Sequence, residues 1–214
     1  MTAPTDRTRH KRLREYGSHD KAVIHAILDA MPVAHVGYVL LGAPVVTPTL
    51  QWREGDRLYW HGSAASRMLE KSEGLPVSVT VTLIDGLVLA RSGFNHSINY
   101  RSAMLFGTAE RVKDASAKAK HLETFMEQIL PGRWPTLRPM SAKELKATTI
   151  LTIPIDEASA KVTAGMPKDD EEDYAFPVWA GLVPVSLAAQ EPQSDPRNLP
   201  GQDPPEHARR WRIG

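Results

Sequence analysis

A dense run of chemically capable side chains lies at residues 94–102, between two strand-like apolar segments. It holds an imidazole, an amide, a phenol, a guanidinium and two hydroxyls. Ordinary hairpin connections are shorter and rely on Gly, Asn and Asp. A polar loop this rich on a β scaffold is a typical binding site. We therefore predict a binding loop, with its contacts at Ser97, Asn99, Tyr100, Arg101 and Ser102.

A second polar cluster runs from His61 to Arg67, where an expected strand ends and a short helix begins. Gly62 permits close approach of the backbone, and Ser63 or Ser66 suits a helix cap. Free backbone N–H groups at a helix start, together with a guanidinium, form an anion site. The alternative interpretation is a plain capped junction whose arginine is solvated.

Arg67 and Arg101 are thus the candidates for binding a phosphate. Thr47 and Thr49, on one face of an expected strand, add neutral hydrogen-bonding groups. Tyr100 and Trp179 are large enough to cover a flat apolar ring. A phosphate attached to a planar heteroaromatic body is the ligand that best suits this combination.

Several other chemistries are disfavoured by motifs that the sequence lacks. There is no Gly-x-Ser-x-Gly elbow and no cysteine, which argues against nucleophilic hydrolysis. There is no Gly-x-Gly-x-x-Gly sequence and no P-loop, which argues against a Rossmann dinucleotide site or a Walker-type triphosphate site. A metal site at His61 or His96 is conceivable, but no metal-ligand spacing supports it. We therefore predict no metal and name no catalytic residue.

The composition indicates one globular domain. The 214 residues carry a formal net charge of +1 and no cysteine, which does not indicate steering toward nucleic acid or a membrane. No apolar run is long enough for a transmembrane helix, and the basic start has no apolar segment behind it, so the expected location is the cytoplasm. We expect a basic arm at residues 1–17, one domain at 18–188 and a Pro-rich, disordered or surface-laid tail at 189–214.

The pattern of elements predicts a mainly β fold (α+β) with flanking helices. Alternating segments predict strands at residues 34–40, 44–52, 57–61, 77–84, 103–112 and 149–155, with 157–162 as an extension of the last. Asp85-Gly86 predicts a hairpin turn with a returning strand at 87–91. Helices are expected after Ser18, from Asp114 to Leu130, and after a capping box at Ser141. The acidic run 168–173 is expected to be a solvated loop. A closed or partly closed barrel accommodates such strands without open edges.

Four stretches carry a resemblance to a known family. They are residues 58–68 (LYWHGSAASRM), 79–92 (VTVTLIDGLVLARS), 96–102 (HSINYRS), and 168–174 (KDDEEDY) with 178–181 (VWAG). Together they make the chain similar to the flavin-nucleotide-binding branch of the pyridoxamine 5′-phosphate oxidase-like superfamily, near proteins related to nitroimidazole resistance. The resemblance extends over residues 7–185.

This resemblance implies an FMN-binding split β-barrel that forms a homodimer, with the flavin at the subunit interface. FMN is the expected cofactor, FAD the alternative, and haem or a deazaflavin are less favoured choices. Trp179 is expected to come from the partner subunit. The implied cofactor contacts are Thr47, Thr49, His61, Gly62, Ser63, Arg67, Val81, Thr82, Ser97, Asn99, Tyr100, Arg101, Ser102 and Trp179.

The chain also departs from the family pattern. Asn95 stands where the pattern has a second histidine, and the substrate signature of true pyridoxamine phosphate oxidases is missing near Trp179. The vitamin B6 reaction is therefore not expected. The first hypothesis is an FMN-dependent oxidoreductase acting on a small molecule. The alternative is a non-catalytic protein that binds or sequesters flavin, with His61 or His96 as the candidate ligands if it also binds haem.

Overall fold

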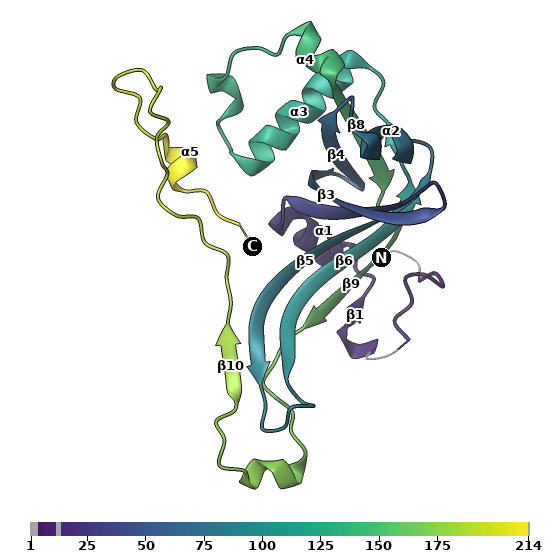
Figure 1. Cartoon of the computed structure of the whole chain (residues 1–214), viewed down its shortest axis with the longest axis vertical. Coiled ribbons are helices and arrows are strands. Elements are labelled where there is room, and N and C mark those ends of the chain that lie inside the picture. Colours follow the sequence, from purple (N-terminus) through teal and green to yellow (C-terminus); the bar gives the residue numbers. More distant parts are fainter. Residues whose placement is uncertain (1–3, 12–13, 214) are drawn as a thin grey trace.

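A computed structural model describes residues 4–11 and 14–213. Within them, one sheet has the strand order β1-β9-β6-β5-β2-β3-β4-β8-β7, and β10 pairs with the far end of β5 (Figure 1). All the strand pairings among the described residues are antiparallel. No helix in this described part of the chain is long and apolar enough to span a bilayer. The strands are β1 (Gly17–Ser18), β2 (Val33–Leu40), β3 (Ala43–Glu54), β4 (Arg57–Ser63), β5 (Pro76–Leu89), β6 (Ser97–Thr108), β7 (Glu110–Arg111), β8 (Thr148–Pro154), β9 (Glu157–Thr163) and β10 (Gly181–Pro184).

The helices flank this sheet, as the sequence predicts. The α-helices are α1 (Lys21–Ala30), α2 (Arg67–Ser72), α3 (Ala115–Ile129), α4 (Ala142–Ala147) and α5 (Glu206–Arg209), and the 3-10 turns are η1 (Arg14–Tyr16), η2 (Trp134–Thr136) and η3 (Glu171–Ala175). Asp114 caps α3 and the Ser141–Glu144 capping box opens α4, both as predicted. The prediction of Ser18 as the first cap is wrong. Asp20 caps α1, because its carboxylate accepts a hydrogen bond from the N–H of Ala22 at 2.9 Å.

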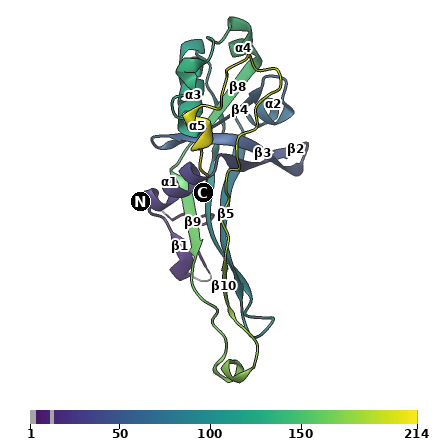
Figure 2. The ribbon, with the colours of Figure 1, turned by 90° about the vertical axis from the view of Figure 1, so that its left-hand side faces the viewer.

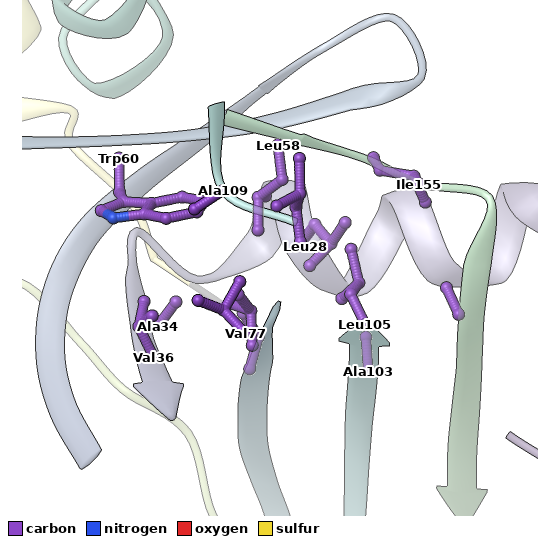
Figure 3. Close-up of a cluster of buried hydrophobic side chains, with 14 of the residues drawn as sticks. Leu28, Ala34, Val36, Leu58, Trp60, Val77, Ala103, Leu105, Ala109 and Ile155 are labelled. Atoms are coloured by element: carbon purple, nitrogen blue, oxygen red, sulfur yellow. The ribbon is translucent and has the colours of Figure 1, made fainter. Parts of the chain in front are cut away.

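The curved strands enclose the main hydrophobic core. Along β5 the residues Val77, Val79, Val81 and Leu83 are buried, while the residues between them face outward. Side chains from the strands and α1 meet at a common centre, where Leu28, Trp60 and Leu105 come together (Figure 3). Clean alternation therefore predicts the inward face correctly. The result is the split β-barrel with flanking helices that the sequence predicts.

A smaller core lies between the β3–β4–β8 part of the sheet and α3. Its buried members are Trp52, Tyr59, Leu122, Phe125 and Ile150. Glu54 closes it with two hydrogen bonds, from Trp52 Nε1 at 2.7 Å and His121 Nδ1 at 2.8 Å. These contacts fix α3 against the sheet, beside the end of β4 where one of the predicted clusters lies.

The prediction of a hairpin turn at Asp85-Gly86 is wrong. Strand β5 continues through this dipeptide to Leu89, and its pairing with β6 shifts register between Ile84 and Gly86. Such a β-bulge inserts one extra residue into a strand. Local turn chemistry is overridden because Asp85 pairs with Arg101 on β6, and because Gly86 leaves room for β10 to approach.

The predicted binding loop is also shorter than the sequence indicates. The connection between β5 and β6 ends at His96, and β6 begins at Ser97. Asn99, Tyr100, Arg101 and Ser102 therefore lie on a paired strand, where their side chains alternate between the two faces. Of the strand predicted at 103–112, residues 103–108 are the second half of β6, and residues 110–111 are the separate strand β7, which pairs with β8.

Beyond β8 the chain differs from the sequence prediction at two places. Residues 157–162 are not an extension of β8, because β9 turns back and pairs with β6. The acidic run is not wholly solvated, since the Asp169 side chain is fully buried and forms an ion pair with Arg91 at 3.0 Å. This pair fastens the return segment that leads to β10, a strand that the sequence patterns do not indicate.

The C-terminal tail runs from β10 back along the side of the molecule toward α3 (Figure 2). Most of its side chains from Val185 to Pro205 are exposed. The tail ends in the short helix α5, near the end of α3. The division of the chain into arm, domain and tail at 1–17, 18–188 and 189–214 stays a prediction.

Gly86 offers a test of how β10 is held. A Cβ at this position would lie 2.8 Å from Leu182 Cδ1 and 3.1 Å from the Val183 carbonyl oxygen. We expect Gly86→Val to lower the free energy of unfolding by about 1–3 kcal/mol. It should also speed hydrogen exchange of the β10 amides, because the strand must move away.

Gly93→Val is the matched control, since a Cβ there meets nothing within 4 Å. Thermal unfolding and amide exchange measured by mass spectrometry report both quantities. Equal effects of the two substitutions would contradict the close approach of β10 at Gly86.

Candidate functional site

The junction of β4 and α2 brings Gly62, Ser63 and Arg67 together. Gly62 is tightly placed, because a Cβ on it would lie 3.0 Å from Leu69 Cδ1. Arg67 is the first residue of α2 and is exposed. It forms no ion pair with any other residue that the structure describes. The guanidinium is thus free to meet an anion from solvent.

The backbone N–H groups at this junction are less available than the sequence suggests. The N–H of Ala64 donates to the Ala147 carbonyl at 2.7 Å, and that of Ser66 donates to the Ser63 carbonyl at 2.9 Å. The N–H of Ala65 donates to Ser63 Oγ at 3.2 Å. These three N–H groups precede α2 and are not free. The first turn of α2 itself receives no cap hydrogen bond from the Ser66 side chain. Arg67, in that first turn, is the charged group that an anion would meet.

Of the two predicted threonines on β3, Thr49 contacts β4 directly. Thr47 and Thr49 pair with Val36 and Ala34 of β2, and both side chains are partly exposed. The Thr49 hydroxyl donates a long hydrogen bond of 3.4 Å to the His61 carbonyl. We call Thr47, Thr49, His61, Gly62, Ser63 and Arg67 the strand-end group.

His61 differs from the rest of the strand-end group because its ring packs among aromatic side chains. Its centroid lies 4.7 Å from that of Phe125 and 5.7 Å from that of Trp52, edge-on in both cases. Burial lowers the pKa of His61, so the imidazole is neutral near pH 7. Its Nδ1 is buried and has no hydrogen-bond partner among the described residues.

Arg101 is already paired, unlike Arg67. Its guanidinium donates to both carboxylate oxygens of Asp85, with N–O distances of 2.8 to 3.1 Å. This hydrogen bonding raises the pKa of Arg101. Sequence reasoning missed Asp85 because the dipeptide Asp-Gly reads as a turn. Any ligand phosphate at Arg101 must compete with a bidentate carboxylate, so Arg67 is the better anion contact.

The other predicted residues of β5 and β6 fall on different faces. Thr82 lies opposite Ser102 on the outer face, while the Val81 side chain is buried in the core and can offer a ligand only its backbone. Asn99 is buried and donates to the Gly165 carbonyl at 2.9 Å. We call Thr82, Ser97, Asn99, Tyr100, Arg101 and Ser102 the long-strand group.

Part of the long-strand group borders a hollow of about 210 Å³. Ser97, Asn99 and Tyr100 line it together with two cations, Lys161 and Lys168. The Lys161 ammonium lies 5.3 Å from the centre of the Tyr100 ring, a cation–π contact. Sequence patterns do not single out these lysines, because strand pairing brings them here from β9 and beyond.

Trp179 stands apart from both groups. Its side chain is 66% exposed. The ring lies against Gly181 at the start of β10, where a Cβ would come within 2.7 Å of it. In this single chain it covers its own backbone, and a large aromatic surface remains open to solvent.

The structure therefore gathers the predicted residues into two places. The strand-end group lies near α2, and the long-strand group lies toward the opposite end of β5 and β6, with β2 between them in the sheet (Figure 1). One place offers an unpaired guanidinium with hydroxyls, and the other offers an aromatic ring with amide and ammonium groups. No group of three or more His, Asp or Glu side chains suited to a metal ion occurs at residues 4–11 or 14–213.

Comparison with known proteins agrees with this architecture. The family model described as pyridoxamine 5′-phosphate oxidase matches residues 20–162. The flavocytochrome Anf3 from Azotobacter vinelandii is 49% identical over the whole of both chains, with a TM-score of 0.95. No curated protein matches the sequence significantly.

Two further solved structures are similar. The FAD and haem binding protein from Mycobacterium smegmatis is 38% identical, with a TM-score of 0.88 over 92% of this chain and 98% of that one. A protein from Bacteroides thetaiotaomicron, described as related to 5-nitroimidazole antibiotic resistance, is 25% identical over 68% of this chain and 86% of that one, with a TM-score of 0.56. The predicted resemblance is confirmed, and the chain belongs to the pyridoxamine 5′-phosphate oxidase family.

Proposed function

We propose that this protein binds a flavin nucleotide and uses it to oxidise or reduce a small molecule. The observation that carries the proposal is the full-length similarity to a flavocytochrome, at 49% identity. A second similar protein, at 38% identity, is described as binding FAD and haem. FMN and FAD both remain candidates, and a deazaflavin is a weaker one.

The strand-end group fits the polar part of a flavin nucleotide. Arg67 supplies an unpaired cation for a phosphate. Ser63 precedes it by four residues, and the Thr49 hydroxyl reaches β4 at the His61 carbonyl. A bound flavin supplies the redox chemistry, so the protein has to bind, orient and shield it. No side chain of either group needs to act as an acid or base in this proposal.

Removing the unpaired guanidinium tests the flavin site. We expect Arg67→Ala to weaken FMN or FAD binding about 10- to 100-fold, because a charge-assisted hydrogen bond is worth roughly 1.5–3 kcal/mol. Quenching of flavin fluorescence measures the affinity. Arg197→Ala removes the same charge from the exposed tail and should leave it unchanged. Protein that carries no chromophore and binds neither FMN nor FAD would rule out the proposal.

A turnover assay distinguishes an oxidoreductase from a protein that only carries or sequesters flavin. An oxidoreductase should oxidise NAD(P)H steadily in the presence of a small-molecule acceptor. A carrier or sequestering protein, which is the alternative, should bind flavin without such turnover. The substrate and the electron donor are open in both cases.

A homodimer is the second part of the proposal. Val183, Leu87 and Ile98 lie directly opposite one another on β10, β5 and β6, so they share one face. They are 41%, 42% and 43% exposed, and Ile84 beside them is 52% exposed. A continuous apolar row on a paired sheet is typical of a surface that another protein covers. The resemblance to flavin-binding split barrels implies that the flavin lies between two such copies.

A charge placed in this row should disrupt the dimer. We expect Ile98→Asp to give a monomer in light scattering and to lose flavin in the same step, because an isolated carboxylate is costly to bury. Leu41→Asp is the control, since Leu41 is 99% exposed at the turn between β2 and β3. A monomeric variant that keeps full flavin affinity would contradict a site shared between subunits.

Haem binding is a second candidate function, favoured by the geometry of His96. Its Nδ1 lies 2.8 Å from the Ser92 carbonyl oxygen. A carbonyl only accepts, so Nδ1 carries a proton and Nε2 is the ring nitrogen left to bind a metal. Metal-ligating histidines commonly have such a partner on the other ring nitrogen. His61 lacks one among the described residues and is wedged between aromatic rings.

Haem titration of two variants distinguishes the histidines. His96→Ala should abolish or shift the Soret band of the haem-loaded protein. His61→Ala should preserve it while lowering the melting temperature, because it removes a ring from the smaller core. The opposite pattern would assign His61 as the ligand, and an unchanged spectrum in both variants would exclude both histidines.

A further inference from the structure

A hollow of about 330 Å³ lies where β7, β8, α3 and α4 meet, outside both groups described above. Its walls come from segments far apart in the chain. Four cationic side chains line it against a single carboxylate, in a protein whose formal net charge is only +1. The charged lining residues are Arg111, Lys113, Lys118, Lys146 and Glu73.

The four cationic side chains differ in the hydrogen bonds and ion pairs that they already form. Lys118 Nζ donates to the carbonyls of Leu145 and Thr148 at 2.9 and 2.8 Å, so its ammonium is held in place by neutral groups that leave its charge uncancelled. Arg111 pairs with Glu73 at 2.7 Å. Lys113 and Lys146 are exposed and form no ion pair with the rest of the described chain. Three positive charges thus stay without a countercharge.

The hollow borders the strand-end group. Ala64, which directly follows Ser63, is one of its lining residues. Thr148 and Thr149 also line it, and they pair across β4 and β8 with Ser63 and Gly62. A ligand anchored at Arg67 and the occupant of this hollow would therefore lie next to each other.

We propose that this hollow binds a nucleoside phosphate. Fixed and free ammonium groups around one cavity suit the charge of a phosphate. The Thr148 hydroxyl donates to the Glu144 carbonyl at 2.9 Å, so its oxygen is left to accept a hydrogen bond from a ribose hydroxyl. Its volume is at the lower end of ligand pockets, enough for part of a dinucleotide. The inference rests on the proposed flavin site in one respect: the occupant is either the AMP half of FAD or part of a separate nicotinamide dinucleotide.

Titration with ADP, followed by calorimetry, tests the site directly. We expect ADP to bind the flavin-free protein, and the double variant Lys113→Ala/Lys146→Ala to bind it about tenfold more weakly, equivalent to about 1.4 kcal/mol. Binding should weaken with added salt. The control Lys120→Ala/Lys143→Ala removes two charges from helices α3 and α4, which border the hollow, at residues that do not line it. It should stay within about twofold of the unsubstituted protein.

No ADP binding, or equal weakening in both double variants, would overturn the inference. ADP binding that is blocked by FAD but not by FMN identifies the AMP half of FAD as the occupant. ADP binding that persists with FAD bound identifies a separate dinucleotide. A protein that binds ADP here but no flavin would refute the proposed function alone, whereas flavin binding with no ADP site would refute only this inference.

Discussion

The extra residue at the bulge in β5 determines where the later side chains of that strand point. Before the bulge the odd-numbered residues are buried, from Val77 to Leu83. After it the even-numbered Val88 and Ala90 are buried and Leu87 is exposed. Side chains alternate with a period of two, so one inserted residue exchanges the two faces. The bidentate pair of Asp85 and Arg101 holds the inserted residue in place.

The arrangement of β10 and of the strand ends beside it depends on this reversal of the inward and outward faces of β5. With Leu87 turned outward, it joins Ile98 and Val183 in one exposed apolar row. With Gly86 at the bulge, β10 can pair closely with β5 and direct the tail back toward α3. The same ion pair therefore shapes the surface proposed for a partner and removes Arg101 from the list of free cations.

Sequence patterns predict the barrel core and the helices α3 and α4 well. They predict the end of β5 beyond the bulge, and the β10 strand that pairs with it, poorly. Strict alternation and cap residues give the barrel core, α3 and α4, because those signals are local. Asp85-Gly86 reads as a turn on the same local rules, yet strand pairing overrides it. The buried positions change from odd-numbered residues, ending at Leu83, to even-numbered ones, starting at Val88. This change is the signal that could have revealed the bulge. The burial of Asp169 depends on a residue 78 positions away, and the pairing of β10 depends on residues 92 to 98 positions away. No local pattern encodes such contacts.

For the candidate site, residue type is predictable but availability is not. Arg67 and Arg101 are equivalent in the sequence, and only the position of Asp85 makes one of them free and the other neutralised. His61 and His96 are likewise equivalent until burial and the Ser92 carbonyl distinguish them. A ligand binds best to groups that have no hydrogen-bond partner in the protein. A donor that already has one must first break that hydrogen bond, and this costs free energy. Two of the groups that a ligand could use, the Arg67 guanidinium on α2 and the Nε2 of His96 just before β6, lie in separate parts of the molecule. That separation is the physical reason for expecting that one copy of the chain alone does not complete the site.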